Sequence, residues 1–415
     1  FYNNTYISII IISHSSITMD EEAFRRQFMT KSVFRKAGSL DLSYVPEKLY
    51  CRDEALKTLI YNFRRILEEE EQPSINCLIL GKGGVGKTVT ARYFGRNFNT
   101  IAKEKDVKMF LEYFNCINFR SKSKIIREML SKYTHGSGRG FSDDEALKLI
   151  LTQLIREQGY MLLIIDEVHL LKSDEVLAFL DIAETFGHQN AKLSILLISR
   201  IKDWMRIETE RILSRINEKI KLKPYNFDES KQILQYRSEL AFKENVIDDN
   251  ILNMVSRIVD EHRNMRHGIE ILRKSGLYAD KEGIAKITPD IIREASNDVY
   301  PTFRGDIVDK LSDQELLALY GIVRSLINKE EPYTLVDDAF EEYEAICENY
   351  SIEPHVKMSY RKYVRQLNQL KIISSKTVRI EEAERGRHLE IYLLDIPAPK
   401  LEELLINIFE KKFGS

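Results

Sequence analysis

At residues 75–88 the chain reads Ile75-Asn76-Cys77-Leu78-Ile79-Leu80 and then Gly81-Lys82-Gly83-Gly84-Val85-Gly86-Lys87-Thr88, and this stretch decides the fold. The apolar run is typical of a buried parallel strand, and residues 87–98 have the pattern of a helix. Glycines let the backbone turn with its N–H groups inward, so the loop and the helix N-terminus form a cradle for an anion. The alternative, a Gly-rich surface turn, does not account for the flanking strand and helix.

The strand, loop and helix together predict a site for ATP or ADP with Mg²⁺. Lys87 would place its charge on the β and γ phosphates, and Thr88 would give its hydroxyl to Mg²⁺. The predicted nucleotide-binding residues of this stretch are Gly81, Lys82, Gly83, Gly84, Val85, Gly86, Lys87, Thr88 and Val89. Upstream, the candidates for the adenine pocket are Val45, Pro46 and Arg52, with a core-facing role as the alternative for the two apolar residues.

A second motif is a pair of acids at the end of the apolar run 161–165. Ligands bind outside the carboxyl ends of the strands in open α/β sheets, so the acids fall where chemistry is expected. Asp166 is the predicted Mg²⁺ ligand, and Glu167 is predicted to orient and deprotonate the attacking water. The apolar run 193–199 predicts a further strand, and Arg200 follows it at the position of a γ-phosphate sensor.

Two further arginines are candidate catalytic residues. Arg211 stands in a short helical patch and could reach the nucleotide of a neighbouring subunit as an arginine finger. The alternative for Arg211 is a surface arginine in a local ion pair. Arg266 begins a helix of a small strandless region and would reach the phosphates if that region folds over the site.

The composition bounds the class of protein. A chain of 415 residues is long enough for roughly three domains. The net charge of −2, with 30% charged residues, means that any nucleic-acid surface is a local patch. The four cysteines stand singly and form no Cys-x-x-Cys pair, which disfavours a metal site or a disulfide framework and fits a reducing cytosol.

The first eighteen residues differ from the rest of the chain. The apolar run 7–12 is too short to span a bilayer, and no Lys or Arg precedes it as a secretory signal requires. We expect residues 1–18 to be a non-native or disordered N-terminus, with Met19 as the natural start. No membrane partner is expected, and the predicted location is cytoplasmic.

The chain divides into three predicted domains after residue 18. Residues 19–224 are expected to form an α/β nucleotide-binding domain with a parallel sheet, and residues 225–299 a small all-α lid domain after Pro224. Residues 306–415 are expected to form a winged-helix domain. Its predicted helices span about 313–328, 335–350 and 358–370, and its strands span 372–380 and 389–394. Ser312 is predicted to open the first helix in a capping box, and Thr334 to cap the second.

The winged-helix region carries a local excess of positive charge. From residue 358 to 388 there are eight Lys or Arg against three Glu, as a phosphate-binding surface requires. The third helix is predicted to bury Tyr360, Val364, Leu367 and Leu370. The candidate DNA-binding residues are Ser359, Arg361, Lys362, Arg365 and Gln366 on the helix and Arg385 and Arg387 at the wing tip. Some winged helices bind only protein.

The ordered motifs resemble the archaeal origin-recognition initiators, which are AAA+ proteins related to the largest subunit of the eukaryotic origin recognition complex and to its helicase-loading partner. The similarity covers about residues 40–395. The matching stretches are Tyr44-Val45-Pro46 with Arg52-Asp53-Glu54, the phosphate loop, Ile164-Ile165-Asp166-Glu167, Ile198-Ser199, Arg211-Ile212-Leu213-Ser214, Ile233-Leu234 with Arg237, and Arg266 with Leu272-Arg273.

The resemblance implies a function and partners. It implies a nucleotide-switched protein that binds duplex origin DNA in the nucleoid, pairs with a paralogous initiator subunit and helps to recruit the replicative helicase. It also implies that Arg237 contacts the nucleotide. In that family an inserted helix of the ATPase domain touches DNA, which adds Lys122, Lys124 and Arg139 to the candidate contacts.

Two positions depart from the family pattern. Arg200 stands where the family usually has Asn, and His169 replaces a common acid, so we expect a weak and slow ATPase. Two other functions remain open from the sequence. One is an AAA+ signalling or scaffold ATPase whose winged helix binds protein, and the other is a transposition or repair ATPase that binds DNA without sequence preference.

Overall fold

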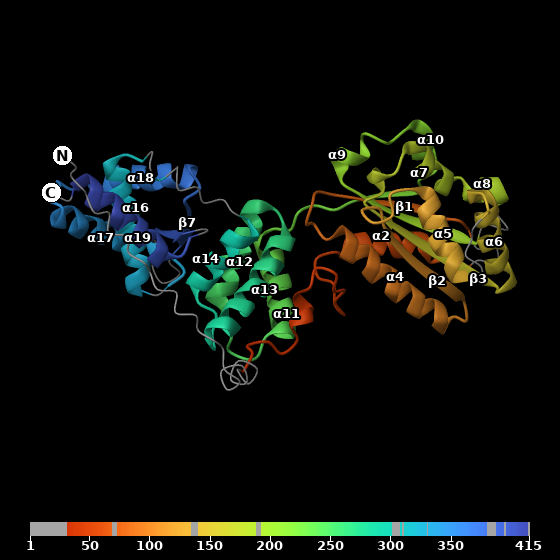
Figure 1. Cartoon of the computed structure of the whole chain (residues 1–415), viewed down its shortest axis with the longest axis horizontal. Helices are drawn as coiled ribbons and strands as arrows, with labels where there is room; N and C mark the ends of the chain where they lie inside the picture. Colours follow the sequence, from red (N-terminus) through yellow and green to blue (C-terminus); the bar gives the residue numbers. More distant parts are fainter. Residues whose placement is uncertain are drawn as a thin grey trace, which may run out of the picture.

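The protein is described by a computed structural model. It describes residues 31–68, 73–133, 140–187, 192–300, 308, 311–329, 331–379, 387–393 and 396–413. Three parts follow one another along the long axis in chain order: an α/β part, a helical lid and a winged helix (Figure 1). The predicted fold class is confirmed.

The α/β part is built on a five-stranded parallel sheet in the order β2-β3-β4-β1-β5. The strands are β1 (Asn76–Leu80), β2 (Lys108–Asn115), β3 (Gly159–Asp166), β4 (Leu193–Ser199) and β5 (Glu218–Lys221). Every residue of β1, β3 and β4 is buried, as continuous apolar runs require in a parallel sheet. Because all strands run the same way, the loop after β1 and the acids after β3 emerge at one edge.

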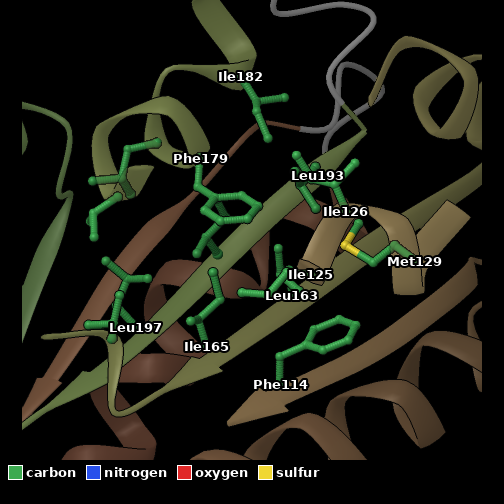
Figure 2. Close-up of a cluster of buried hydrophobic side chains, with 14 of the residues drawn as sticks. Phe114, Ile125, Ile126, Met129, Leu163, Ile165, Phe179, Ile182, Leu193 and Leu197 are labelled. Carbon is green, nitrogen blue, oxygen red and sulfur yellow. The ribbon is translucent and has the colours of Figure 1, made fainter. Parts of the chain in front are cut away.

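Helices cover both faces of this sheet. On one face, Leu163 and Ile165 of β3 point into a cluster with Phe114, Ile125 and Met129 (Figure 2). The alternate residues of β3 pack on the other face against α2 and α4. The helices of this part are α2 (Asp53–Phe63), α3 (Arg65–Glu68), α4 (Lys87–Glu104), α5 (Lys122–Tyr133), α6 (Asp143–Arg156), η2 (Val168–Leu170), α7 (Ser173–Leu180), α8 (Ile182–Phe186), α9 (Ile201–Trp204) and α10 (Glu210–Ser214). The short helix η1 (Ala37–Leu40) precedes them and packs on the lid helices α11 and α13.

The lid consists of α11 (Phe227–Ala241), α12 (Asp249–His262), α13 (Met265–Glu282) and α14 (Pro289–Val299). Residues 225–299 are fully described and contain no strand element, as predicted. Helix α14 was not predicted, although its start has clear signals: Thr288 accepts a hydrogen bond from the Ile291 N–H, and Pro289 is the first helical residue. The chain before the sheet also packs here, since the rings of Phe34 and Phe242 stack 5.0 Å apart.

The C-terminal part is a winged helix with one added helix. Its elements are α16 (Asp313–Lys329), β6 (Thr334–Leu335), α17 (Val336–Asn349), α18 (Lys357–Gln369), β7 (Ile373–Arg379), β8 (Arg387–Leu393) and α19 (Ala398–Phe413), with the sheet order β6-β8-β7. The capping box at Ser312 is confirmed by its reciprocal hydrogen bonds with Glu315. Helix α19 was not predicted; its apolar face is buried against α16.

Two predictions for this part were wrong. Thr334 does not cap α17, because it lies in β6 and its hydroxyl is 2.6 Å from that of Ser325. Leu370 is 42% exposed, because α18 ends at Gln369 and the chain turns before the apolar stripe continues. None of the described helices combines the length and apolar character needed to cross a membrane.

The lid and the winged helix are joined by mostly buried polar contacts. Arg257 of α12 places its Nη2 atom 3.1 Å from Oε2 of Glu390 in β8. Arg293 of α14, only 2% exposed, donates to the Pro332 carbonyl at 3.2 Å. Guanidinium groups in this setting are costly to separate from their acceptors, so these contacts fix the winged helix on the lid.

Candidate nucleotide site and nucleic-acid interface

The phosphate loop, residues 81–88 after β1, folds around the side chain of Lys87. Gly84 and Gly86 have φ angles of 71° and 88°, a left-handed region that glycine adopts without strain. Lys87 begins α4, is 6% exposed and donates from Nζ to the carbonyls of Gly81 at 3.1 Å and Lys82 at 2.8 Å. Burial lowers the pKa of Lys87. The loop thus holds a desolvated ammonium group beside backbone N–H groups, a suitable arrangement for phosphate.

The acid at the end of β3 meets the hydroxyl that begins α4. Asp166 is 1% exposed, and its Oδ2 accepts hydrogen bonds from Thr88 Oγ1 at 2.6 Å and from the Tyr113 hydroxyl at 2.9 Å. Burial, with Asp166 next in effect, raises the pKa of Tyr113, so its hydroxyl stays protonated and donates. Mg²⁺ takes oxygen ligands and is often held by only one or two protein groups beside phosphates, so Thr88 and Asp166 fit such a site.

Glu167 lies between two basic side chains. Its Oε2 atom is 3.4 Å from His169 Nε2 and 3.6 Å from Arg200 Nε, and it has no hydrogen-bond partner among the described residues. Ser199 holds the far side of the imidazole, with its hydroxyl 3.1 Å from His169 Nδ1. The backbone at Glu167 is left-handed, with φ 52°, a conformation that residues other than glycine seldom adopt.

A pocket opens between the phosphate loop and the lid. Its polar lining comes from Asp41, Lys48, Gly83, Gly84, Gly86, Lys87, Thr88, Glu167, Arg200, Arg237 and Arg266. Its apolar and aromatic lining includes Leu42, Tyr44, Pro46, Leu49, Tyr50, Val89, Tyr225, Ile233, Tyr236, Met265 and Ile269. A pocket with one cationic, N–H-rich region and one aromatic region suits a nucleoside phosphate.

The lid contacts the phosphate loop directly. The N–H of Met265, the first residue of α13, donates to the Gly84 carbonyl at 3.2 Å. Asn264 caps the same helix, and its amide lies so near Gly84 that a Cβ there would meet Asn264 Oδ1 at 1.6 Å. Arg266 follows and lines the pocket. A shift of the phosphate loop would therefore also displace the start of α13.

Two of the predicted base-pocket residues stand outside the lining. Arg52 is 8% exposed, donates to the carbonyls of Val85 at 2.7 Å and Lys223 at 3.1 Å, and stacks 3.6 Å from the ring centre of Tyr225. It therefore supports the loop from behind instead of forming the pocket wall. Val45 contributes a carbonyl that accepts from Arg96 at 3.1 Å.

Arg237 lines the pocket, but its donors are partly engaged. Its Nε atom donates to the Ser39 carbonyl at 2.6 Å and its Nη2 atom to the Asp41 carbonyl at 3.2 Å. Burial lowers the pKa of Arg237 to about 10. The side chain thus ties the segment before the sheet to the lid.

Sequence reasoning missed the aromatic lining and Tyr113. Ile233, Tyr236 and Arg237 lie one turn apart on α11, and this spacing was the available signal. Tyr113 reaches Asp166 because β2 pairs with β3, a partnership that the sequence alone does not specify.

Arg211 lies away from this chain's own pocket. Its side chain is 74% exposed, and its Nη2 atom is 3.7 Å from Asp181 Oδ2. An exposed pair at this distance contributes little, so the guanidinium is available to another surface.

Helix α18 presents the positive surface of the winged helix. Lys362 and Arg365 are exposed and form no ion pair with any described residue, whereas Arg361 lies 4.0 Å from Asp337. Ser359 is half-buried, and Gln366 has a buried Oε1 without a partner in the described part. The predicted contact Arg385 lies outside the described residues. For Arg387 the structure gives only a backbone position in β8.

The inserted helix α5 is less available than predicted. The Lys122 side chain is 19% exposed and lies 3.6 Å from Asp143, whereas Lys124 is exposed. Arg139 falls outside the described residues.

Three protein-family models match the three parts of the chain. They are an AAA domain at residues 72–202, a Cdc6 AAA+ ATPase-type lid domain at 231–297, and a CDC6 C-terminal winged helix domain at 306–403. The lid and winged-helix models are both named for Cdc6, and they follow the AAA domain in order along the chain. The chain belongs to the Cdc6/ORC1-type family.

Curated Cdc6/ORC1-type relatives align over almost the whole chain. An ORC1-type DNA replication protein of Thermococcus onnurineus is 26% identical over 386 residues, which cover 90% of this chain and 91% of the relative. The ORC1-type DNA replication protein 2 of Saccharolobus solfataricus is 28% identical over 385 residues, with 89% and 92% covered.

Solved Cdc6/ORC1-type structures share the fold. The crystal structure of Cdc6p from Pyrobaculum aerophilum has a TM-score of 0.80 at 24% identity and covers 92% of this chain and 100% of that one. The Aeropyrum pernix ORC1 protein, solved in complex with DNA, has a TM-score of 0.58 at 20% identity and covers 92% and 98%.

Proposed function

We propose that this Cdc6/ORC1-type protein is an ATP-dependent replication initiator that binds duplex origin DNA and uses its nucleotide state as a switch. One observation carries the proposal: a continuous set of contacts joins the nucleotide loop to the basic winged helix. Gly84 bonds to Met265 of the lid, and Arg257 of the lid bonds to Glu390 of the winged helix. The names of the relatives, which are DNA replication proteins, and the DNA-bound state of the A. pernix ORC1 structure support the same function.

The loop and the acid pair supply the chemistry of an ATPase. Lys87 would contact the β and γ phosphates, and Thr88 and Asp166 would hold Mg²⁺, which when bound neutralises phosphate charge. Glu167 would accept the proton of the attacking water. Because Arg200 and His169 already flank the carboxylate of Glu167, we expect slow hydrolysis and therefore a long-lived ATP state.

The lid converts nucleotide state into an angle between domains. Arg266 lines the pocket and would contact phosphate, so loss of the γ phosphate would release the start of α13. The winged helix would move with the lid, because Arg257 and Arg293 hold the two together. DNA affinity would then differ between the ATP and ADP states.

Assembly would complete the switch. Arg211 projects from the surface and would act on the nucleotide of a paralogous initiator subunit bound alongside on DNA. The assembly would recruit the replicative helicase and would be located on the nucleoid in the cytoplasm.

The test combines genome-wide mapping with duplex binding in solution. We expect genome-wide mapping to give sharp peaks at a few loci. In solution, fragments from these peaks should bind the protein, and the slope of log affinity against log salt concentration should decrease in magnitude by about one for each of Lys362→Ala and Arg365→Ala. Lys87→Ala should abolish tight ATP binding. Uniform occupancy along the genome would instead indicate DNA binding without sequence preference, and absence of duplex binding would indicate a winged helix that binds only protein.

A further inference from the structure

The start of α18 carries the two most exposed large apolar side chains of the described residues. Met358, in the first turn, is 81% exposed, and Val356, directly before the helix, is 70% exposed. Apolar area left in water is unfavourable, and contact with a partner removes that cost. The pair therefore marks a contact point whose partner must offer apolar surface.

Met358 belongs to the outward face of the helix. Residues at i, i+4, i+7 and i+11 share one side of a helix, and Met358, Lys362, Arg365 and Gln369 follow this spacing and are all exposed. The buried residues Tyr360, Val364 and Leu367 lie on the opposite side. Met358 therefore lies in one row of side chains with Lys362 and Arg365, the two cations that form no ion pair with a described residue.

The charge on this helix indicates the kind of partner. Helix α18 contains Lys357, Arg361, Lys362 and Arg365 and no acidic residue. The Nζ atom of Lys357 is 2.8 Å from Oδ1 of Asp337 in α17, and Arg361 also lies near Asp337. In contrast, Lys362 and Arg365 make no ion pair with a described residue. The outward face is positive with an apolar end, so its complement is a polyanion that also exposes an apolar group.

Duplex DNA has both properties. The C5-methyl group of thymine is an apolar group in the major groove, flanked by phosphates on either side. Residues at the N-terminal end of a recognition helix reach the base edges, which is where Met358 stands. An apolar protein surface over Met358 would instead have to remove water from Lys362 and Arg365 without pairing them, at a considerable cost.

We propose that Met358, with Val356 beside it, packs against the C5-methyl group of thymine and makes thymine the preferred base at one or two positions of the bound sequence. This inference rests on the proposed binding of duplex DNA by the winged helix. The unbranched thioether of methionine adapts to the groove, so the contact selects the methyl group without a fixed hydrogen-bond pattern.

The test uses the full chain and a duplex selected by it from a randomised library of roughly 30 base pairs. Each thymine is replaced in turn by deoxyuridine, which removes only the C5-methyl group. We expect affinity to fall about fourfold at one or two positions, the value of one buried methyl group. A uniform response within about 1.5-fold at all positions would overturn the proposal.

The Met358→Ala variant assigns the effect to its residue. In this variant the sensitive thymines should become insensitive to deoxyuridine, while the other positions behave as in the wild type. Val356→Ala should reduce the same sensitivity in part. Retention of the full deoxyuridine effect in Met358→Ala would refute the assignment. Both side chains are exposed, so their truncation leaves the core intact.

The Lys362→Ala variant is the matched control from the same face. It should lower affinity for every duplex and reduce the salt slope, yet keep the deoxyuridine effect. If the wild-type chain selects no duplex at all, the proposed function itself has failed. If it selects duplexes without responding to the methyl group, only the role of Met358 has failed.

Discussion

Arg200 places its Nε atom 3.6 Å from Oε2 of Glu167, the carboxylate at the end of β3 that would activate water. The same oxygen lies 3.4 Å from His169 Nε2 and accepts no hydrogen bond from a described residue. Arg200 and His169, the two residues that we expected to depart from the family pattern, thus converge on one carboxylate. A cation at this distance would compete with the attacking water for the oxygen, and we therefore expect it to restrain hydrolysis.

Replacement of Arg200 by Asn should therefore increase turnover. We expect a rise of about tenfold in phosphate release at saturating ATP and Mg²⁺, which is less than the roughly 10²- to 10⁴-fold that a general base contributes. For Glu167→Ala we expect a fall of about 10²-fold or more. Arg206→Asn is the matched control, because that arginine pairs with Asp203 and is 79% exposed. Slower turnover in Arg200→Asn would mean that the guanidinium stabilises phosphate charge instead.

Gly84 should tolerate no side chain. Its φ is 71°, and a Cβ would meet Asn264 Oδ1 at 1.6 Å, so Gly84→Ala must both strain the loop and push α13 away. We expect a loss of roughly 1–3 kcal/mol in the free energy of unfolding and at least a tenfold loss of ATP affinity.

Gly83→Ala is the control for this change. No protein atom lies within 4 Å of a Cβ built at Gly83, so Gly83→Ala should leave the free energy of unfolding and the contact between loop and lid almost unchanged. Denaturation curves and fluorescent-nucleotide titrations on both variants measure these effects. Equal behaviour of the two variants would argue against the contact between loop and lid.

Much of the architecture could be predicted because the central strands are unambiguous. The apolar runs of β1, β3 and β4 read directly as buried strands, and the capping box at Ser312 marked the start of α16. Strand β5 could not be predicted, because Glu218–Lys221 contains one apolar residue, Ile220, and its pairing with β1 comes from tertiary contacts.

The candidate site, like the fold, has some residues that the sequence predicts and others that it does not. Lys87, Thr88 and Asp166 follow from a motif with fixed spacing, and parallel strands bring them to one edge. Contacts made across long sequence separations could not be predicted, such as that of Tyr113 with Asp166 across 53 residues. The approach of Asn264 to Gly84 likewise depends on how the lid docks.

The lid should lose stability in mild acid. The rings of His262 and His267 lie 5.7 Å apart beside Tyr300. Burial is the main cause that lowers the pKa of each histidine. Lys371 lowers the pKa of His262 further, while Glu270 raises and Arg266 lowers that of His267. Asn264 Oδ1 accepts from the Arg266 N–H, so its amide nitrogen must donate to His267 Nε2, 2.8 Å away, and a proton on that nitrogen would break the bond.

The sign of the pH effect follows from these directions. Each folded pKa lies below the unfolded value of 6.5, so below that pH the unfolded chain takes up protons first. The free energy of unfolding should therefore fall from about pH 7.5 to about pH 5.5, and the fall should be smaller in a variant with His262→Gln and His267→Gln. Denaturant titrations at several pH values measure it, and an identical slope in both proteins would exclude these histidines as the cause.

The contact between Arg257 and Glu390 should transmit the nucleotide state to DNA. Their side chains are 18% and 10% exposed, so Arg257→Ala leaves a nearly buried carboxylate without its cation and should cost roughly 1–3 kcal/mol in the free energy of unfolding. If lid and winged helix move as one body, the variant should also reduce the difference in duplex affinity between the ATP-bound and ADP-bound protein. Lys400→Ala is the control in the same interface, because the pair with Glu294 is 60% and 37% exposed and contributes little. A full ATP-to-ADP difference in Arg257→Ala would place the coupling elsewhere than in this ion pair.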